Sequence, residues 1–219
     1  MNVPYYTITE SSDSKTIGPE YPQMECIDID IKDGLDTLSL HKGKYIKKVD
    51  KIYNLRLPVK GKITDVMSCS LGAGGDFIVS ERFFNILRQV NCSSVQFLPI
   101  TFEHKKSLHN NFYYVHFTYK LEKFIDFEKS VYNEYFIEGL NKNKPKNYTE
   151  YSRLVNKHKK YNHFGLVKTI FQETFPAEED LFVLSYANQN KYISTRLFEI
   201  IKSMKITGVE IKRANDIGF

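Results

Sequence analysis

Six histidines are the residues of this 219-residue chain that could bind a metal or transfer a proton, and their spacing favours neither role. His104 and His109 fall in a predicted loop, where they could share a metal with a third ligand or lie exposed. No two histidines stand four residues apart on a predicted helix with a carboxylate between them. His158 and His163 flank a lysine cluster, whose positive charge opposes a bound cation. We therefore predict no metal site, and we favour lone, exposed loop histidines at His104 and His109.

The candidate nucleophiles have no helper residues near them. Ser80 has a counterpart in Ser194, and neither lies in a Gly-x-Ser-x-Gly sequence. Both serines precede a predicted helix, so an N-cap role explains them. Cys69 lies among small residues without an adjacent acid or base to activate its thiol. Arg82 and Arg196 follow the two serines at the same distance; they could contact a ligand, but an ion pair with a neighbouring strand is the simpler expectation. We predict no catalytic residue, no cofactor and no enzymatic activity.

Two further segments contain residues that could take part in metal binding, acid–base catalysis or phosphate binding. Residues 25–31 alternate apolar and acidic side chains, as a half-buried strand does, which places Asp28 and Asp30 on one face. The pair could serve a metal or acid–base chemistry, although a solvated face of an edge strand is favoured. Residues 68–75 (SCSLGAGG) are glycine-rich, but the glycines precede a strand and no Gly-Lys-Ser/Thr follows, as a phosphate loop would need. We expect a turn there.

The elements that position these residues occur twice in the sequence. Residues 78–97 (IVSERFFNILRQVNCSSVQF) align without a gap with residues 192–211 (YISTRLFEIIKSMKITGVEI). Each copy begins with a short strand, continues with a serine at the N-cap position and ends in a second strand. Between them, apolar residues at i, i+3, i+4 and i+7 form one helical stripe, Phe83, Ile86, Leu87 and Val90 in one copy and Leu197, Ile200, Ile201 and Met204 in the other. We predict two strand–helix–strand pseudo-repeat units, residues 77–98 and 191–212, packed on the sheet that their strands join.

The remaining patterns predict mainly strands. Alternating or aromatic-rich runs are found at residues 3–9, 25–31, 97–101, 111–123, 131–137, 165–173 and 180–186. Residues 11–23 have the composition of a loop. Residues 141–163 are almost entirely polar and form a surface excursion, with a short, mostly exposed helix over 149–161. The predicted fold class is α+β, with a mixed, mostly antiparallel sheet in a single domain over residues 1–219.

Composition limits the classes of protein to which the chain can belong. Hydrophobic residues make up 42% of the chain, with sixteen Phe and fifteen Tyr, enough to build a core. The three cysteines, Cys26, Cys69 and Cys92, are widely spaced and suit free thiols in a reducing cytosol. No signal peptide and no apolar run long enough to span a membrane is apparent. We predict a cytoplasmic protein.

Two lysine-rich segments leave a second function open. Residues 42–62 interleave lysines with Tyr and aliphatic residues, and residues 142–160 hold a further lysine cluster. Such mixtures can bind a phosphate backbone, with aromatic rings as stacking platforms. They are also typical of a solvated cationic surface, and a formal net charge of +5 is low for a dedicated nucleic-acid-binding protein. Nucleic acid is therefore the alternative partner.

Three motifs together resemble the immunity proteins of bacterial polymorphic toxin systems, most closely the eleventh and the related forty-third immunity families, formerly known as domains of unknown function. One is V-S-E-R-x-x-x-x-L followed by a V-x-F strand, within residues 79–97. Another is an aromatic strand, residues 112–119, that leads into D-x-E-x-S at 126–130. The last is D-x-F-x-L leading into S-x-R-L, within residues 180–197. Thr195 stands where the family pattern prefers Glu, and the lysine-rich connection is longer than usual.

The resemblance covers residues 5–211 and implies a non-catalytic antidote. Such a protein would bind a cognate bacterial toxin domain and block its active site or an essential surface. The resemblance implies neither a cofactor nor a membrane partner. It assigns no partner-binding residues, and the sequence indicates neither the toxin nor the oligomeric state.

Overall fold

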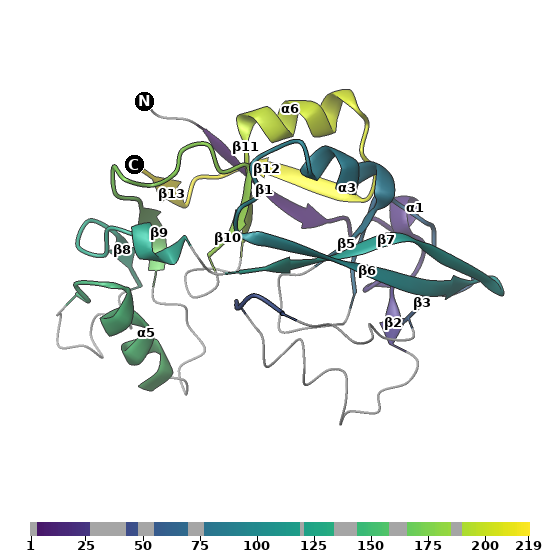
Figure 1. Ribbon diagram of the computed structural model, residues 1–219, viewed down its shortest axis with the longest axis horizontal. Helices are drawn as coiled ribbons and strands as arrows, with labels where there is room; N and C mark the ends of the chain where they lie inside the picture. The colour runs from purple at the N-terminus through teal and green to yellow at the C-terminus, as the bar shows by residue number, and fades with distance from the viewer. Residues whose placement is uncertain are drawn as a thin grey trace.

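The computed structural model describes residues 4–26, 43–47, 55–69, 77–118, 121–133, 144–157, 166–184 and 190–219 (Figure 1). These residues form an α+β protein with mixed, mostly antiparallel sheets, as predicted. No helix in the described ranges is long and apolar enough to cross a membrane.

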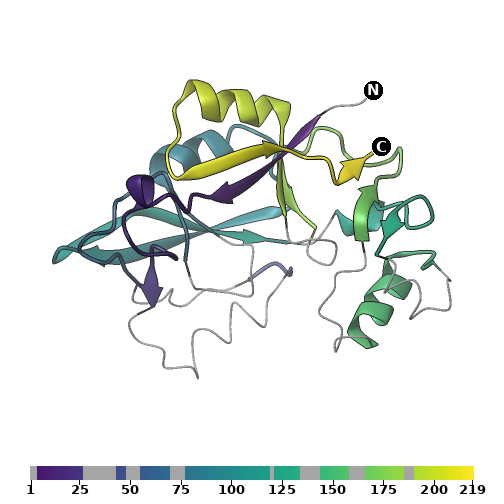
Figure 2. The same ribbon diagram turned by 180° about the vertical axis from the view of Figure 1, so that it is seen from behind.

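The largest sheet has six strands in the order β2-β3-β6-β7-β5-β4. Its strands are β2 (Glu25–Cys26), β3 (Leu55–Arg56), β6 (Val95–His104), β7 (Ser107–Phe117), β5 (Phe77–Ser80) and β4 (Val66–Met67). Neighbouring strands are antiparallel except for β3 and β6. The long β6–β7 hairpin forms the middle of this sheet, and its turn projects from one end of the molecule (Figures 1 and 2).

A second sheet has four antiparallel strands in the order β10-β11-β1-β12. Its strands are β10 (Leu181–Val183), β11 (Lys191–Ser194), β1 (Tyr5–Glu10) and β12 (Val209–Arg213). The N-terminal strand β1 therefore lies between two strands from the other end of the chain. This pairing holds the two ends of the sequence together.

The two predicted strand–helix–strand successions are present. One is β5, α3 (Glu81–Leu87) and β6, and the other is β11, α6 (Thr195–Ser203) and β12. In each, the two strands joined by the helix are both antiparallel to the strand between them, β7 or β1, and so run parallel to each other. In Figures 1 and 2 the two helices lie beside each other on one side of the molecule. That the two segments are repeats of one unit stays a prediction.

Both helices begin at the predicted serine. The Ser80 hydroxyl accepts a hydrogen bond from the Phe83 amide at 3.3 Å, and the Ser194 hydroxyl accepts one from the Leu197 amide at 3.1 Å. The apolar stripe buries Phe83, Ile86 and Leu87 in α3, and Leu197 and Ile201 in α6. Met204 was expected in the stripe, but it is 45% exposed because α6 ends one residue before it.

Apolar residues of both sheets and both helices form one shared cluster. It includes residues from β1, β4, β5, β7, β10, β11, α3 and α6, among them Ile8, Val66, Phe77, Phe83, Val115, Leu181, Ile193 and Leu197. Because neither helix is long enough to be stable alone in water, this packing is what maintains them.

A smaller three-stranded sheet lies at the end of the molecule opposite the β6–β7 turn (Figures 1 and 2). Its order is β13 (Ile217–Gly218), β9 (Leu166–Ile170) and β8 (Val131–Tyr132). The helix predicted over 149–161 is present as α5 (Tyr148–Lys157). Its Tyr151 is buried, with its ring 5.2 Å from that of Phe127. The polar excursion therefore contributes an aromatic anchor to the core.

Two sequence-based expectations about loops are wrong. The segment 11–23 contains a short helix, α1 (Ser14–Ile17), which Asp13 caps by accepting a hydrogen bond from the Lys15 amide. His104 and His109 were expected to be exposed in a loop, but they lie on β6 and β7, and His104 is buried. The two strands are joined by a turn at Lys105 and Lys106, both with a positive φ. This turn lacks the Asn-Gly sequence that usually marks a two-residue hairpin.

Candidate functional site

The Ser80 hydroxyl points to a carboxylate. Its Oγ donates to Oδ1 of Asp65 at 2.8 Å, and Arg82 Nη1 lies 3.4 Å from Asp65 Oδ2. The same carboxylate accepts hydrogen bonds from the amide and the hydroxyl of Thr207, each at 3.0 Å. Since Asp65 directly precedes β4, it ties the first turn of α3 to a strand edge and to the segment after α6.

Ser194 has an equivalent partner in Asp180, the residue before β10. The Asp180 carboxylate accepts hydrogen bonds from the Ser194 hydroxyl, the Arg196 guanidinium and, at 2.8 Å, the Asn91 amide. Burial alone would raise the pKa of Asp180, but the hydrogen bonds from Arg196, Ser194 and Asn91 outweigh it and hold the pKa below its ordinary value. The predicted ion pair of each arginine is confirmed, with an acid that directly precedes a strand.

The two acids cross-link the helices. Each holds the first turn of its own helix and a residue that follows the other helix, Thr207 after α6 and Asn91 after α3. Arg82 also donates to the main-chain carbonyl of Met204, at the end of α6. Both serines donate to carboxylates and cap helices, so neither is arranged as a nucleophile. Of the two acids, Asp180 belongs to a motif visible in the sequence, whereas Asp65 had no signal beyond preceding a short strand.

A third buried carboxylate, that of Glu179, also accepts several hydrogen bonds. Glu179 has no exposed surface and accepts hydrogen bonds from the Ser93 hydroxyl at 2.7 Å and from the amide and hydroxyl of Ser94, each at 3.0 Å. The neighbouring Cys92 is in reduced form, and its pKa is raised by burial and by the negative charges of Glu179 and Asp180. Its thiol therefore stays protonated at neutral pH and is a poor nucleophile.

The histidines of the described residues bind the protein's own main chain or pack on rings. His104 is buried with Nδ1 3.1 Å from a carbonyl oxygen, and His116 Nε2 lies 2.8 Å from the carbonyl of Lys44. The His109 ring stacks on Phe102 with centroids 5.0 Å apart. No group of three or more His, Cys, Asp or Glu side chains in the described ranges could hold a metal ion. Cys69 is half-buried beside Met24.

Several predicted candidates lie outside the described residues. They are Asp28, Asp30, His41, His158, His163 and residues 70–75 of the glycine-rich segment.

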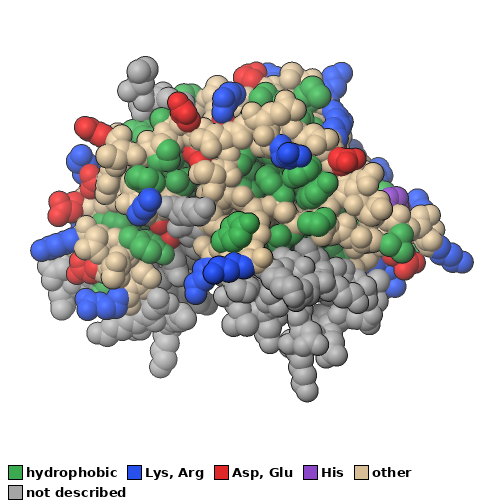
Figure 3. All heavy atoms as spheres, viewed as in Figure 1, with side chains coloured by type: hydrophobic (Ala, Val, Ile, Leu, Met, Phe, Trp, Pro, Cys, Tyr) green, Lys and Arg blue, Asp and Glu red, His purple; other side chains and the backbone are tan. Residues whose placement is uncertain are grey.

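Lysines of both lysine-rich segments bond to the fold itself. Lys62 Nζ donates to the carbonyl of Lys15 at 2.7 Å. Lys144 Nζ donates to the carbonyls of Glu128 and Ser130 at 2.9 and 3.0 Å, and lies 5.6 Å from the centre of the Tyr132 ring. On the face shown in Figure 3, Lys and Arg side chains are interspersed with Asp and Glu. This distribution differs from the continuous basic stripe of a nucleic-acid-binding surface.

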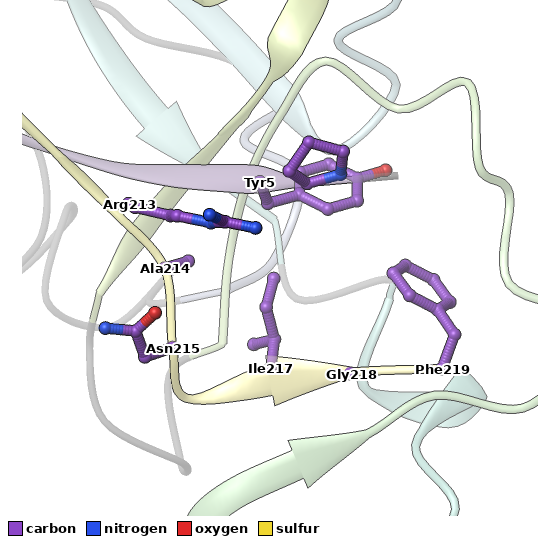
Figure 4. A pocket seen from close by; sticks show the side chains of 8 residues that line it. Tyr5, Arg213, Ala214, Asn215, Ile217, Gly218 and Phe219 are labelled. Carbon is purple, nitrogen blue, oxygen red and sulfur yellow. The ribbon is translucent and has the colours of Figure 1, made fainter. Parts of the chain in front are cut away.

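A pocket of about 250 Å³ opens where β12 leaves the four-stranded sheet (Figure 4). Its walls are formed by both ends of the chain, Pro4, Tyr5, Arg213, Ala214, Asn215, Ile217, Gly218 and Phe219. Arg213 extends towards Ile217, and the Phe219 ring borders the opposite side (Figure 4). The pocket thus has one cationic group among walls that are partly polar and partly apolar.

The frame of this pocket is fixed by hydrogen bonds. The Ala214 amide donates to the Tyr5 carbonyl at 3.0 Å, and the Thr169 amide donates to the Asp216 carbonyl at 2.8 Å. The Asp216 carboxylate accepts from the buried Tyr192 hydroxyl at 2.6 Å and from the Asn190 amide group at 2.9 Å. These bonds fix the turn between β12 and β13.

Arg213 itself is exposed and has no hydrogen bond or ion pair with a described residue. Four other arginines have a partner within the protein. Arg82 and Arg196 pair with aspartates, Arg56 pairs with Glu25 at 3.2 Å, and the Arg88 guanidinium lies 5.6 Å from the centre of the Phe84 ring. Arg153, on α5, is exposed and likewise unpaired with described residues, but it does not line the pocket.

A family model described as "Immunity protein family (Imm11)" matches residues 6–216, nearly the whole chain. A comparison with curated proteins gave no match.

Proposed function

The chain belongs to the Imm11 immunity protein family, and we propose that it binds a cognate bacterial toxin domain and neutralises it without catalysis. The observation that carries this proposal is the family match over residues 6–216. The site geometry agrees with it, because Ser80, Ser194 and Glu179 are bonded within the fold. The protein would act in the cytoplasm, as a stoichiometric inhibitor.

We further propose that residues 1–219 form one domain. In support, one apolar cluster joins the two larger sheets and the helices α3 and α6. A second cluster joins the four-stranded sheet to the three-stranded sheet and α5 through Tyr5, Phe182 and Tyr192. The core is thus shared between the parts.

The partner surface is expected to bury a standard-sized interface with aromatic and arginine anchors near its centre. Among the described tyrosines, Tyr21 and Tyr45 are 59% and 62% exposed. An exposed tyrosine contributes a large, rigid contact area at little entropic cost.

The proposal is tested by co-expression. The product of the gene directly upstream is produced in a bacterial host with and without this protein, and tagged complexes are then purified. Growth arrest by the neighbour alone, relief by this protein and co-purification of a stable complex are the expected results. A harmless neighbour with no complex would remove the proposal's main support. A steeply salt-dependent affinity for random RNA or DNA would then favour the nucleic-acid alternative.

A further inference from the structure

We propose that the pocket lined by Arg213 receives a carboxylate side chain of the toxin, and that Arg213 is the group that pairs with it. This inference rests on the proposed function. It identifies one subsite of the interface and the chemistry that fills it.

The side chains that line the pocket favour a carboxylate side chain as the ligand. A guanidinium presents a planar fork of donors that matches both oxygens of a carboxylate, and Arg213 has no such partner within the described chain. The apolar side chains of Ile217 and Phe219 border the same space (Figure 4). They complement the methylene groups of an acidic side chain, glutamate above all, which has a carboxylate on a short apolar stem.

The presence of only one cationic side chain, Arg213, in the pocket lining favours a carboxylate over a nucleic-acid phosphate as the ligand. Binding to a nucleic-acid backbone uses several lysines or arginines to neutralise successive phosphates. Of the residues that line this pocket, Arg213 alone carries a cationic side chain. This single guanidinium matches one singly charged carboxylate.

The frame of the pocket requires little ordering when a ligand binds. Tyr5 is 2% exposed, and its hydroxyl donates to the carbonyls of Ala177 and Glu179 at 3.3 and 3.4 Å. Asp216 is held by Tyr192 and Asn190. The exposed Arg213 side chain must lose freedom on binding, whereas the buried Tyr5 is already ordered, which limits the entropic cost.

The test measures binding of the purified toxin from the neighbouring gene to the full-length protein by calorimetry. Arg213→Ala is expected to weaken binding about 10- to 100-fold, as for a contact at the centre of an interface, and Arg213→Glu to weaken it further. Arg213→Lys should be intermediate because an ammonium group is a point charge without the guanidinium fork. Arg153→Ala is the matched control, an exposed arginine outside the pocket, and should bind as the unmodified protein does. Thermal unfolding of each variant checks that the fold is intact.

The carboxylate is then identified by charge reversal. Each surface Asp or Glu of the toxin is changed to Arg, and the Arg213→Glu protein is screened against this set. Restored binding by one toxin variant is the expected result. Normal toxin binding by folded Arg213→Ala and Arg213→Glu would overturn the inference and leave the proposed function standing. Failure of the unmodified protein to bind the toxin would count against the proposed function instead. Loss of RNA binding alone in Arg213→Ala would assign the pocket to a phosphate and likewise overturn it.

Discussion

Asp65 and Asp180 have equivalent structural roles, Asp65 at the start of α3 and Asp180 at the start of α6. Both are buried, both accept from a capping serine and pair with the arginine two residues after it, and both hold a main-chain amide beyond the other helix. A serine that caps a helix and simultaneously donates to a buried acid has no free hydrogen for a reaction. In this chain the motif residues Ser80, Asp180 and Ser194 therefore have structural partners.

Replacing Asp180 by Ala should lower the free energy of unfolding by about 3 kcal/mol, because the buried Ser194 hydroxyl and Asn91 amide lose their acceptor. Arg196 contributes little to this loss, since its side chain is 58% exposed and can be solvated. Urea unfolding at pH 7 measures the difference. Asp13→Ala is the control, because the exposed Asp13 caps only the short helix α1, and its loss should lower stability by clearly less than that of Asp180. Equal effects of the two substitutions would contradict this account.

Asp180 also makes the stability of the protein depend on pH under acidic conditions. Its pKa is lowered in the folded protein, so its contribution is fully present above the unfolded value of about 3.9 and is lost as pH falls through the folded value. The stability difference between the unmodified protein and Asp180→Asn should therefore shrink below about pH 4. Unfolding curves recorded from neutral pH downwards test this. A difference that stays constant throughout would show that the carboxylate is not ionised in the folded protein.

At the scale of single residues, the sequence predicted the contacts between residues that lie close together in the chain. The caps at Ser80 and Ser194 lie within three residues of the amides that they accept from, and their pattern predicted them. Asp65 and Asp180 stand 15 and 14 residues before their serines, far beyond the i+3 or i+4 spacing by which a local pattern predicts a contact. Such pairings depend on how strands meet in the sheets, which residue spacing alone does not determine.

Among the elements, the β6–β7 hairpin departs most from its prediction. The expected strands covered 97–101 and 111–123, whereas β6 and β7 extend to a turn at Lys105 and Lys106, with φ of 50° and 66°. A lysine in this left-handed region is disfavoured by about 1 kcal/mol relative to an extended or right-handed conformation. The surrounding strand pairing holds the turn in spite of its residues.

Changing the turn to Asn-Gly, as Lys105→Asn with Lys106→Gly, should therefore raise the free energy of unfolding by about 1 kcal/mol. The gain comes from residues that adopt a positive φ readily, and it should appear as a melting temperature several degrees higher. The control changes both lysines to Ala, which removes the same charges and keeps the backbone strain. If the Ala variant gained as much stability, charge repulsion at the turn, and not backbone strain, would be the cause.

At the scale of the whole molecule, the chain termini form the end of the protein that carries the pocket. β1 lies between β11 and β12, and β13 pairs in parallel with β9. The strand pattern of the sequence predicted β1, β9 and β12 as strands but not which strands pair. The pocket could not be foreseen because its residues, Tyr5 and Ile217 among them, come together only through this pairing.

The charge of the whole molecule should govern the rate of association with the proposed toxin partner. The net charge is +5, and on the face shown in Figure 3 the cations are dispersed, so attraction to an acidic toxin surface would act over distance and be screened by salt. The association rate should fall as ionic strength rises from about 0.05 to about 0.5 M, where the Debye length shortens severalfold. Stopped-flow measurement of both rates would separate this effect from that of the pocket.

Arg213→Ala should mainly raise the dissociation rate, because a pair formed in a closed contact acts after encounter. An association rate that did not change with salt would mean that the cationic surplus plays no part in encounter, and that affinity arises only from close contacts such as the one proposed for Arg213.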